Sequence, residues 1–122
     1  MPLNDIPGYA IVFPLGNPRV ISARDFDIPV YFNLDRHYDE GREEFERNVD
    51  IVLKGRGGLL GLRLGNVSGL QVHGFHQWPG FELDDIRHQG WDRKHYKLYC
   101  LESDAVVGFA ESAQLYIPLP YH

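Results

Sequence analysis

The sequence predicts an all-β fold: a single antiparallel sandwich, or a curled, barrel-like sheet, of roughly seven to nine short strands with at most one short helix. Two observations predict it. Apolar and polar residues alternate in short runs, with the period of a half-buried strand. Glycine, proline and aspartate interrupt these runs, as expected for tight connections between antiparallel strands. With 122 residues and no segment that resembles a linker, the chain is expected to form one domain, residues 1–122.

The clearest pattern is a three-stranded meander predicted within residues 67–101. Its first strand is expected at residues 70–74. The second and third strands follow the connections Trp-Pro-Gly (residues 78–80) and Gly-Trp-Asp-Arg (residues 90–93). Alternation that stops at such connections and then restarts is typical of consecutive strands joined by turns.

Further strands are expected on both sides of the meander, at residues 9–13, 19–23, 29–34, 49–54, 60–64, 107–109 and 113–117. A helix over residues 106–113 remains the alternative for the C-terminal part. An irregular arm is expected at residues 1–8, and the glycine-rich residues 55–58 are interpreted as a hairpin connection. No Lys-Ser/Thr pair follows those glycines, so a phosphate-binding loop is rejected.

Residues 35–47 are predicted to be a solvated loop with at most one helical turn. The like-charged pairs Asp39/Glu43 and Glu40/Glu44 stand four residues apart, which disfavours a helix by roughly 0.2–0.5 kcal/mol per pair. The predicted core combines apolar positions from the alternating runs on both sides of this segment: Val49, Ile51, Leu53, Leu62, Leu64, Leu70, Val72, Leu83, Leu98, Cys100 and Phe109.

Composition places the chain among ordinary globular proteins, with 43% hydrophobic and 24% charged residues. Its one cysteine, Cys100, has no partner for an internal disulfide, which favours a reducing compartment. The apolar run at residues 9–13 is too short for a signal peptide or a membrane span. We therefore expect a cytoplasmic protein that does not insert into membranes.

The negative charge is concentrated in the first half of the chain. Residues 1–50 hold ten acids against five bases, whereas residues 51–122 hold seven of each. Within the first half, residues 35–46 carry six acids against two bases. Such a surface disfavours nucleic acid and anionic membrane and favours a partner protein with a basic surface. The bland interpretation, a charged loop that simply stays in water, remains open.

No constellation of catalytic or cofactor-binding residues is predicted. His73 and His76 stand three apart and would point to opposite faces of a strand, so they do not converge on a metal ion. Asp84 and Asp85 are adjacent and would likewise face opposite ways, which excludes a pair for general acid–base work. Cys100 lies in an apolar pattern and is expected to be inert. We predict a non-enzyme without cofactors or metal. A small metal-dependent enzyme that uses His73 and His76 is kept as the third alternative.

The aromatic residues leave a second class of function open. Trp78 and Trp91 lie at predicted connections, where a tryptophan either covers one end of a sandwich or anchors a partner protein. A row of exposed rings formed by Trp78, Trp91 and Tyr99 would instead stack on sugars. The alternative function is therefore a module that binds carbohydrate or another small ligand.

The rhythm of apolar positions over residues 47–117 resembles the small all-β immunity proteins, and related uncharacterised bacterial domains, that are encoded beside polymorphic toxins. The segments that carry the resemblance are residues 49–53, 62–72, 81–86 and 90–98, the last of which begins with Gly-Trp-Asp. The first 45 residues match nothing in that pattern, and Gly65 stands where an aromatic residue is commoner. The resemblance implies a protein that binds a cognate toxin, for example a nuclease, and occludes its active site.

A partner-binding surface is accordingly predicted on the acidic segment, with a tryptophan as apolar anchor. The candidate residues are Asp35, Asp39, Glu40, Glu43, Glu44, Trp78 and Trp91.

Overall fold

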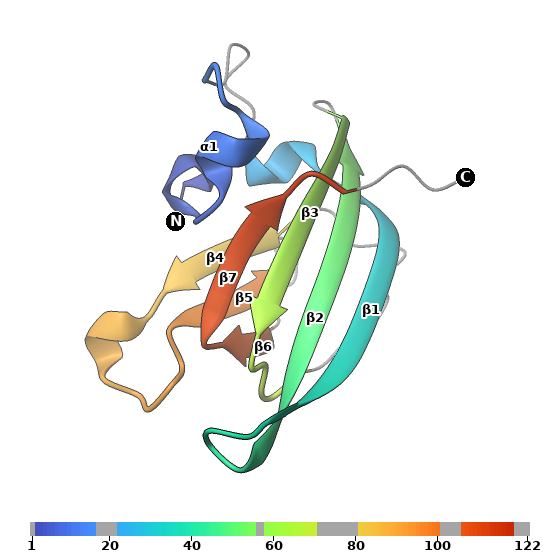
Figure 1. Ribbon diagram of the computed structural model, residues 1–122. Helices are drawn as coiled ribbons and strands as arrows, with labels where there is room; N and C mark the ends of the chain where they lie inside the picture. Colours follow the sequence, from blue (N-terminus) through green and yellow to red (C-terminus); the bar gives the residue numbers. More distant parts are fainter. Residues whose placement is uncertain (1, 17–21, 56–57, 71–80, 101–105, 119–122) are drawn as a thin grey trace.

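The computed structural model describes residues 2–16, 22–55, 58–70, 81–100 and 106–118, and it confirms the all-β fold. Within these residues, seven strands form two antiparallel sheets (Figure 1). The larger sheet has the order β1 (Ile28–Asp39), β2 (Glu44–Gly55), β3 (Gly58–Gly65) and β7 (Ser112–Tyr116). The smaller sheet, behind it in Figure 1, has the order β4 (Phe81–Asp85), β5 (Tyr96–Cys100) and β6 (Val106–Ala110).

The two sheets bury one hydrophobic cluster between them. On the larger sheet, alternate residues of β2 point inward and face their cross-strand neighbours on β3, as in the pairs Val49–Leu64 and Ile51–Leu62. All four side chains are at most 1% exposed. The smaller sheet contributes Phe81, Leu83, Tyr96 and Leu98 to the same cluster. This two-layer arrangement is an antiparallel sandwich.

Seven of the predicted core residues are buried: Val49, Ile51, Leu53, Leu62, Leu64, Leu83 and Leu98. Leu70 and Phe109, which were also predicted to be core residues, are only partly buried. Val72 and the side chain of Cys100 lie outside the described residues. The prediction missed Leu3, Ile6 and Phe26, which come from irregular segments where no periodicity marks a core position.

The strand predicted at residues 9–13 is wrong, because this segment forms the short helix α1 (Tyr9–Val12). Gly8 precedes it with φ +91°, a left-handed conformation, and its Cα lies close against β7. A Cβ at this position would come within 2.2 Å of the Leu115 carbonyl oxygen. The neighbouring Pro7 carbonyl accepts a hydrogen bond from the Leu115 N–H at 2.7 Å. The contact with β7, rather than local propensity, thus determines how this segment enters its helical turn.

Within the described residues, three further segments form single 3₁₀ turns: η1 (Leu3–Asp5), η2 (Ala23–Asp25) and η4 (Arg87–Gln89). The first lies in the predicted irregular arm. The strand predicted at residues 19–23 is wrong at its end, where Ser22 caps η2 through a hydrogen bond from its N–H to the Asp25 carboxylate at 2.8 Å. Residues 19–21, like the predicted strand at residues 71–74, lie outside the described residues.

The segment at residues 35–47 is not a loop, and this is the largest correction. It forms the distal parts of β1 and β2, joined by a turn at residues 40–43. In strands, the like charges that disfavour a helix are separated by the turn or spread along one face. In the C-terminal part, β6 and β7 replace the alternative helix over residues 106–113.

Replacing Gly61 by Ala should destabilise the protein by roughly 1–3 kcal/mol through overpacking. The Tyr116 ring covers Gly61, and a Cβ there would lie 2.5 Å from the ring. Urea denaturation measures the effect, with Gly41→Ala in the exposed turn as the control. In a Tyr116→Ala background the same substitution should cost far less. An equal penalty in both backgrounds would contradict this explanation.

Candidate functional site: the β1–β2 hairpin

The β1–β2 hairpin extends beyond the rest of its sheet (Figure 1). Strand β2 pairs with β3 only from Val49 to Gly55, whereas its pairing with β1 continues to Glu44 at the turn. The turn is stabilised by the Asp39 carboxylate, which accepts hydrogen bonds from the N–H groups of Gly41 at 2.9 Å and Arg42 at 3.2 Å. The distal hairpin is therefore a two-stranded ribbon whose two faces both lie outside the main core.

The register between the strands sorts the side chains of this ribbon by chemistry. Directly opposite residues share a face, so the pairs Asp35–Asn48, His37–Glu46 and Asp39–Glu44 lie on one side. We call this side the acidic face. The other side holds the pairs Leu34–Val49, Arg36–Arg47 and Tyr38–Phe45. We call its exposed members, Leu34, Arg36, Tyr38, Phe45 and Arg47, the arginine–aromatic face.

The acidic face is tied to the body of the protein by ion pairs. Arg42, in the turn, binds Glu111 with two hydrogen bonds of 2.7 Å each and also reaches Glu46 at 3.4 Å. Glu111 lies between β6 and β7, and its carboxylate accepts a further hydrogen bond from Asn66 Nδ2 at 2.8 Å. Arg93, in the connection before β5, binds Glu44. The distal ribbon is thus held in place by residues from three other parts of the chain.

These contacts shift the pKa values of the carboxyl groups. Hydrogen bonds from Arg42 lower the pKa of Glu111 to about 2, aided by Asn66 and opposed by partial burial. The hydrogen bond from Arg93 lowers the pKa of Glu44. The pKa of Glu46 is raised, mainly by desolvation and then by the neighbouring Asp39. Bidentate arginine–carboxylate pairs favour the ionised carboxylate, so the anchoring network is fully charged at neutral pH.

The arginine–aromatic face has no such cover. Leu34, Tyr38 and Phe45 are 48%, 46% and 57% exposed. The Tyr38 and Phe45 rings contact each other with centroids 5.0 Å apart, and the Arg36 guanidinium lies 3.9 Å above the Phe45 ring. A stacked guanidinium keeps its N–H groups available at its edge while its flat surface covers apolar area.

The predicted partner-binding residues occupy three different environments. Asp35, Glu40 and Glu43 are exposed, whereas Asp39 stabilises the turn and Glu44 binds Arg93. Trp91 lies in the same connection as Arg93, is 46% exposed, and packs against Phe109 with ring centroids 5.6 Å apart. Trp78 lies outside the described residues. The structure therefore gathers the acids on one hairpin, but it uses two of them for internal contacts.

Sequence reasoning missed Arg36, Tyr38, Phe45 and Arg47 as candidate residues. The signal was present as alternation, since an aromatic or arginine residue stands at every second position on both sides of the turn. The density of acidic residues concealed this period-two pattern.

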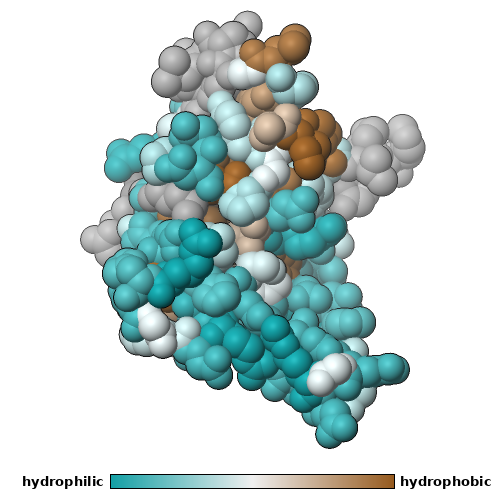
Figure 2. Space-filling view, turned by 60° about the vertical axis from the view of Figure 1, so that its left-hand side comes forward, coloured by the Kyte–Doolittle hydropathy of each residue, from teal (hydrophilic) through white to brown (hydrophobic). Residues whose placement is uncertain are grey.

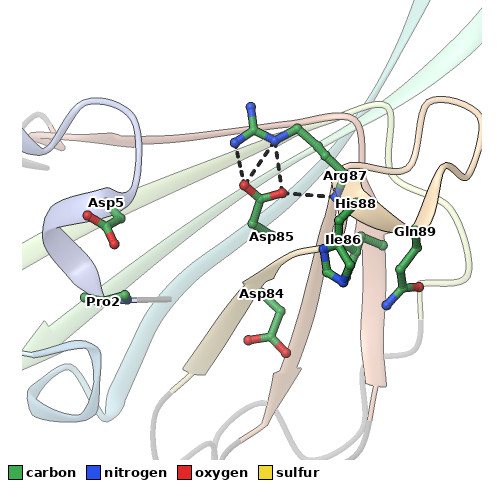
Figure 3. Close-up of a pocket in the computed structure, with 8 residues that line it drawn as sticks. All are labelled: Pro2, Asp5, Asp84, Asp85, Ile86, Arg87, His88 and Gln89. Atoms are coloured by element: carbon green, nitrogen blue, oxygen red, sulfur yellow. Dashed lines mark hydrogen bonds and ion pairs between the residues drawn. The ribbon is translucent and has the colours of Figure 1, made fainter.

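The adjacent Asp84 and Asp85 line a second candidate site, an open depression of about 710 Å³. The two carboxylates point in different directions (Figure 3), as the strand geometry predicts. Asp85 binds Arg87, which lowers the pKa of Asp85 to about 2, and Asp84 accepts a hydrogen bond from Tyr99 Oη at 3.2 Å. Asp84 and Asp85 are therefore not a pair of carboxyl groups poised over one substrate.

The metal-dependent and sugar-binding alternatives depend largely on residues that the structure does not describe. His73 and His76 belong to this group, and among the described residues no three His, Cys, Asp or Glu side chains gather as metal ligands would. For sugar stacking, Trp91 and the partly buried Tyr99 would need Trp78, whose position is not described. In the described part of the chain, no helix is long and apolar enough to cross a membrane.

Comparisons with known proteins assign neither a family nor a function to this chain. No protein-family model, curated protein or solved structure matches this chain.

Acid should weaken the anchoring of the hairpin through protonation of Glu111. Because its pKa is depressed to about 2 from 4.5, the stabilisation is complete above the unfolded value and is lost as the pH falls toward 2. Glu111→Gln should cost roughly 1–3 kcal/mol at pH 7, the range for hydrogen bonds to charged groups. The cost should shrink on acidification, as measured by urea denaturation at several pH values. Glu43→Gln is the control, and a Glu111→Gln penalty that does not change with pH would contradict the assignment.

Proposed function

We propose that this protein is a non-catalytic binding protein that docks a partner protein on its distal β1–β2 hairpin. The observation that carries this proposal is the arginine–aromatic face, where Leu34, Tyr38 and Phe45 remain about half exposed beside two arginines. Tyrosine and arginine are among the residues that dominate binding energy at protein interfaces.

The anchoring of the hairpin supports this proposal on energetic grounds. Binding is weakened when a flexible segment must be ordered, and a surface that is already fixed avoids that cost. Here the bonds from Arg42 to Glu111 and from Arg93 to Glu44 fix the ribbon from its acidic face. They leave the opposite face available, so one face of the hairpin serves stability and the other serves binding.

The resemblance to immunity proteins supports a toxin as the partner. In this proposal the hairpin covers the active site of the toxin, and inhibition is stoichiometric. Asp35, Glu40 and Glu43, which form no ion pair with an arginine side chain among the described residues, extend along the ribbon and around its turn. They would attract a basic toxin surface at the rim of the interface, where charge acts mainly on the rate of association.

A competing apolar surface lies at the opposite end of the molecule. On the face that Figure 2 shows, hydrophobic surface gathers toward the end that carries α1, whereas the visible side of the hairpin end is largely hydrophilic. Ile11 and Leu15 are 64% and 99% exposed there. These two residues provide a matched control for the hairpin, because both surfaces expose large apolar side chains.

The first test co-expresses this protein with the product of the adjacent reading frame, and the proposal expects that product to be a toxin from which this protein protects cells. The double variant Tyr38→Ser/Phe45→Ser should lose protection and bind the toxin at least 100-fold more weakly, since each hot-spot residue contributes about 2 kcal/mol or more. The variant Ile11→Ser/Leu15→Ser should protect like the parent. Circular dichroism would verify that both variants fold. Full protection by the hairpin variant, with loss in the α1 variant, would move the site to the other end.

The second test concerns the exposed acids and uses association kinetics. The triple variant Asp35→Asn/Glu40→Gln/Glu43→Gln should associate with a basic toxin about 10-fold more slowly at low salt, because long-range attraction is reduced. Its dissociation rate should change little, and the difference should fade near 1 M salt, where the Debye length is about 3 Å. Identical association rates at low salt would mean that these acids only solvate the hairpin.

A further inference from the structure

Two arginines stand directly opposite each other on the arginine–aromatic face. The register of β1 and β2 pairs Arg36 with Arg47. Like charges at directly opposite positions destabilise an antiparallel pair, because their side chains leave the sheet about 5 Å apart. The hairpin thus places a repulsive pair at the middle of its most exposed apolar surface.

Among the described residues, no carboxylate forms an ion pair that relieves this repulsion. Arg42, Arg63, Arg87 and Arg93 each form an ion pair. In the part of the chain that the structure describes, neither the Arg36 nor the Arg47 guanidinium lies within 4.0 Å of a carboxylate oxygen; Arg36 contacts Asp35 only through its backbone N–H, at 2.9 Å. The acids of the same hairpin cannot supply one, because the strand period puts them on the acidic face, where Arg42 and Arg93 bind Glu46 and Glu44.

We propose that the partner protein supplies the missing carboxylate, and that an Asp or Glu side chain of the partner binds between Arg36 and Arg47. The site rests on the proposed function and specifies its chemistry. The Arg36 guanidinium lies over the Phe45 ring, 3.9 Å from its centroid, and a guanidinium packed on a ring can still donate from its N–H groups to an incoming carboxylate. Leu34 on one side and Tyr38 with Phe45 on the other surround the two arginines with apolar area that a partner would desolvate.

The surroundings favour a protein carboxylate over the phosphates of a nucleic acid. Two arginines next to each other offer one local anion site, whereas nucleic acid needs an extended basic track. The same ribbon carries Asp35, Glu40 and Glu43, and the chain as a whole has a net charge of −5. The partner surface that fits is therefore mixed: an acidic, apolar centre for this site, within a basic rim for the exposed acids.

The first experiment requires no partner. Arg47→Gln should leave the melting temperature unchanged or raise it by roughly 1–4 °C at low salt, because it removes one of two opposed charges. Arg24→Gln, an exposed arginine in η2, should have no such effect. In ¹⁵N-labelled protein, a capped Glu-Leu-Glu peptide should shift the side-chain Nε–H signals of Arg36 and Arg47 more than that of Arg24. A stronger response to an oligothymidine than to the peptide would overturn the proposal in favour of nucleic acid, and equal shifts at all three arginines would overturn it altogether.

The second experiment uses the inactivated toxin candidate from the neighbouring reading frame. Arg36→Gln/Arg47→Gln should weaken its binding at least 30-fold, mainly through faster dissociation, whereas Arg24→Gln should bind like the parent. A charge reversal, Arg36→Glu/Arg47→Glu, should abolish binding. If the toxin binds the parent and the Gln variant equally well, the carboxylate site is wrong while the proposed function stands. If the toxin does not bind the parent although the peptide shifts Arg36 and Arg47, the toxin assignment is wrong and the site stands.

Discussion

The antiparallel register between β1 and β2 is the constraint on which most of this structure depends. Because opposite residues share a face, the pairing of Phe32 with Ile51 and Leu34 with Val49 directs one side of the hairpin toward the core. The same alternation continues past the end of β3 and carries Arg36, Tyr38, Phe45 and Arg47 on that side. A shift by one residue would exchange the two sets of side chains along the whole ribbon. The core of the sandwich therefore also determines which chemistry the distal hairpin exposes.

The acidic composition of the segment takes on a different meaning once the strands are in place. In a loop, a run of like charges creates a negative potential, but the individual charges have no fixed positions. In this ribbon, several of the charged side chains have fixed positions and specific partners. Asp39 accepts hydrogen bonds from the backbone of the turn. Glu44 binds Arg93, from the connection before β5, and Glu46 binds Arg42, from the turn itself. Exposed ion pairs contribute little to stability one by one, and a connected set with bidentate geometry contributes more. The residues that made the segment look like a binding surface are to a large extent those that hold it in position.

The sequence was most informative where one face of a strand is buried. Val49 and Ile51 flank Asp50, and Leu62 and Leu64 flank Arg63, because burial strongly constrains each second position. At Tyr38 and Phe45 both faces meet solvent, so the alternation is between aromatic and charged residues and resembles the composition of a loop. The five apolar residues from Tyr9 to Phe13 fit a strand or a helical turn equally well, and contact with β7 decides between them. The bond between Arg42 and Glu111 joins residues 69 positions apart, and no local pattern encodes such a pairing.

The long-range bond between Arg42 and Glu111 also bears on the order in which parts of the chain fold. The β1–β2 hairpin closes over a four-residue turn and can pair early, because its contacts are local. Its turn, however, binds a carboxylate that lies at the start of β7, a strand that must first find β3 across the intervening chain. Until β7 pairs with β3, Glu111 is not in position to bind Arg42. The distal hairpin can then move relative to β3. The fixed position of the proposed binding surface therefore depends on the C-terminal strand, because Glu111 reaches Arg42 only when β7 is paired in the sheet.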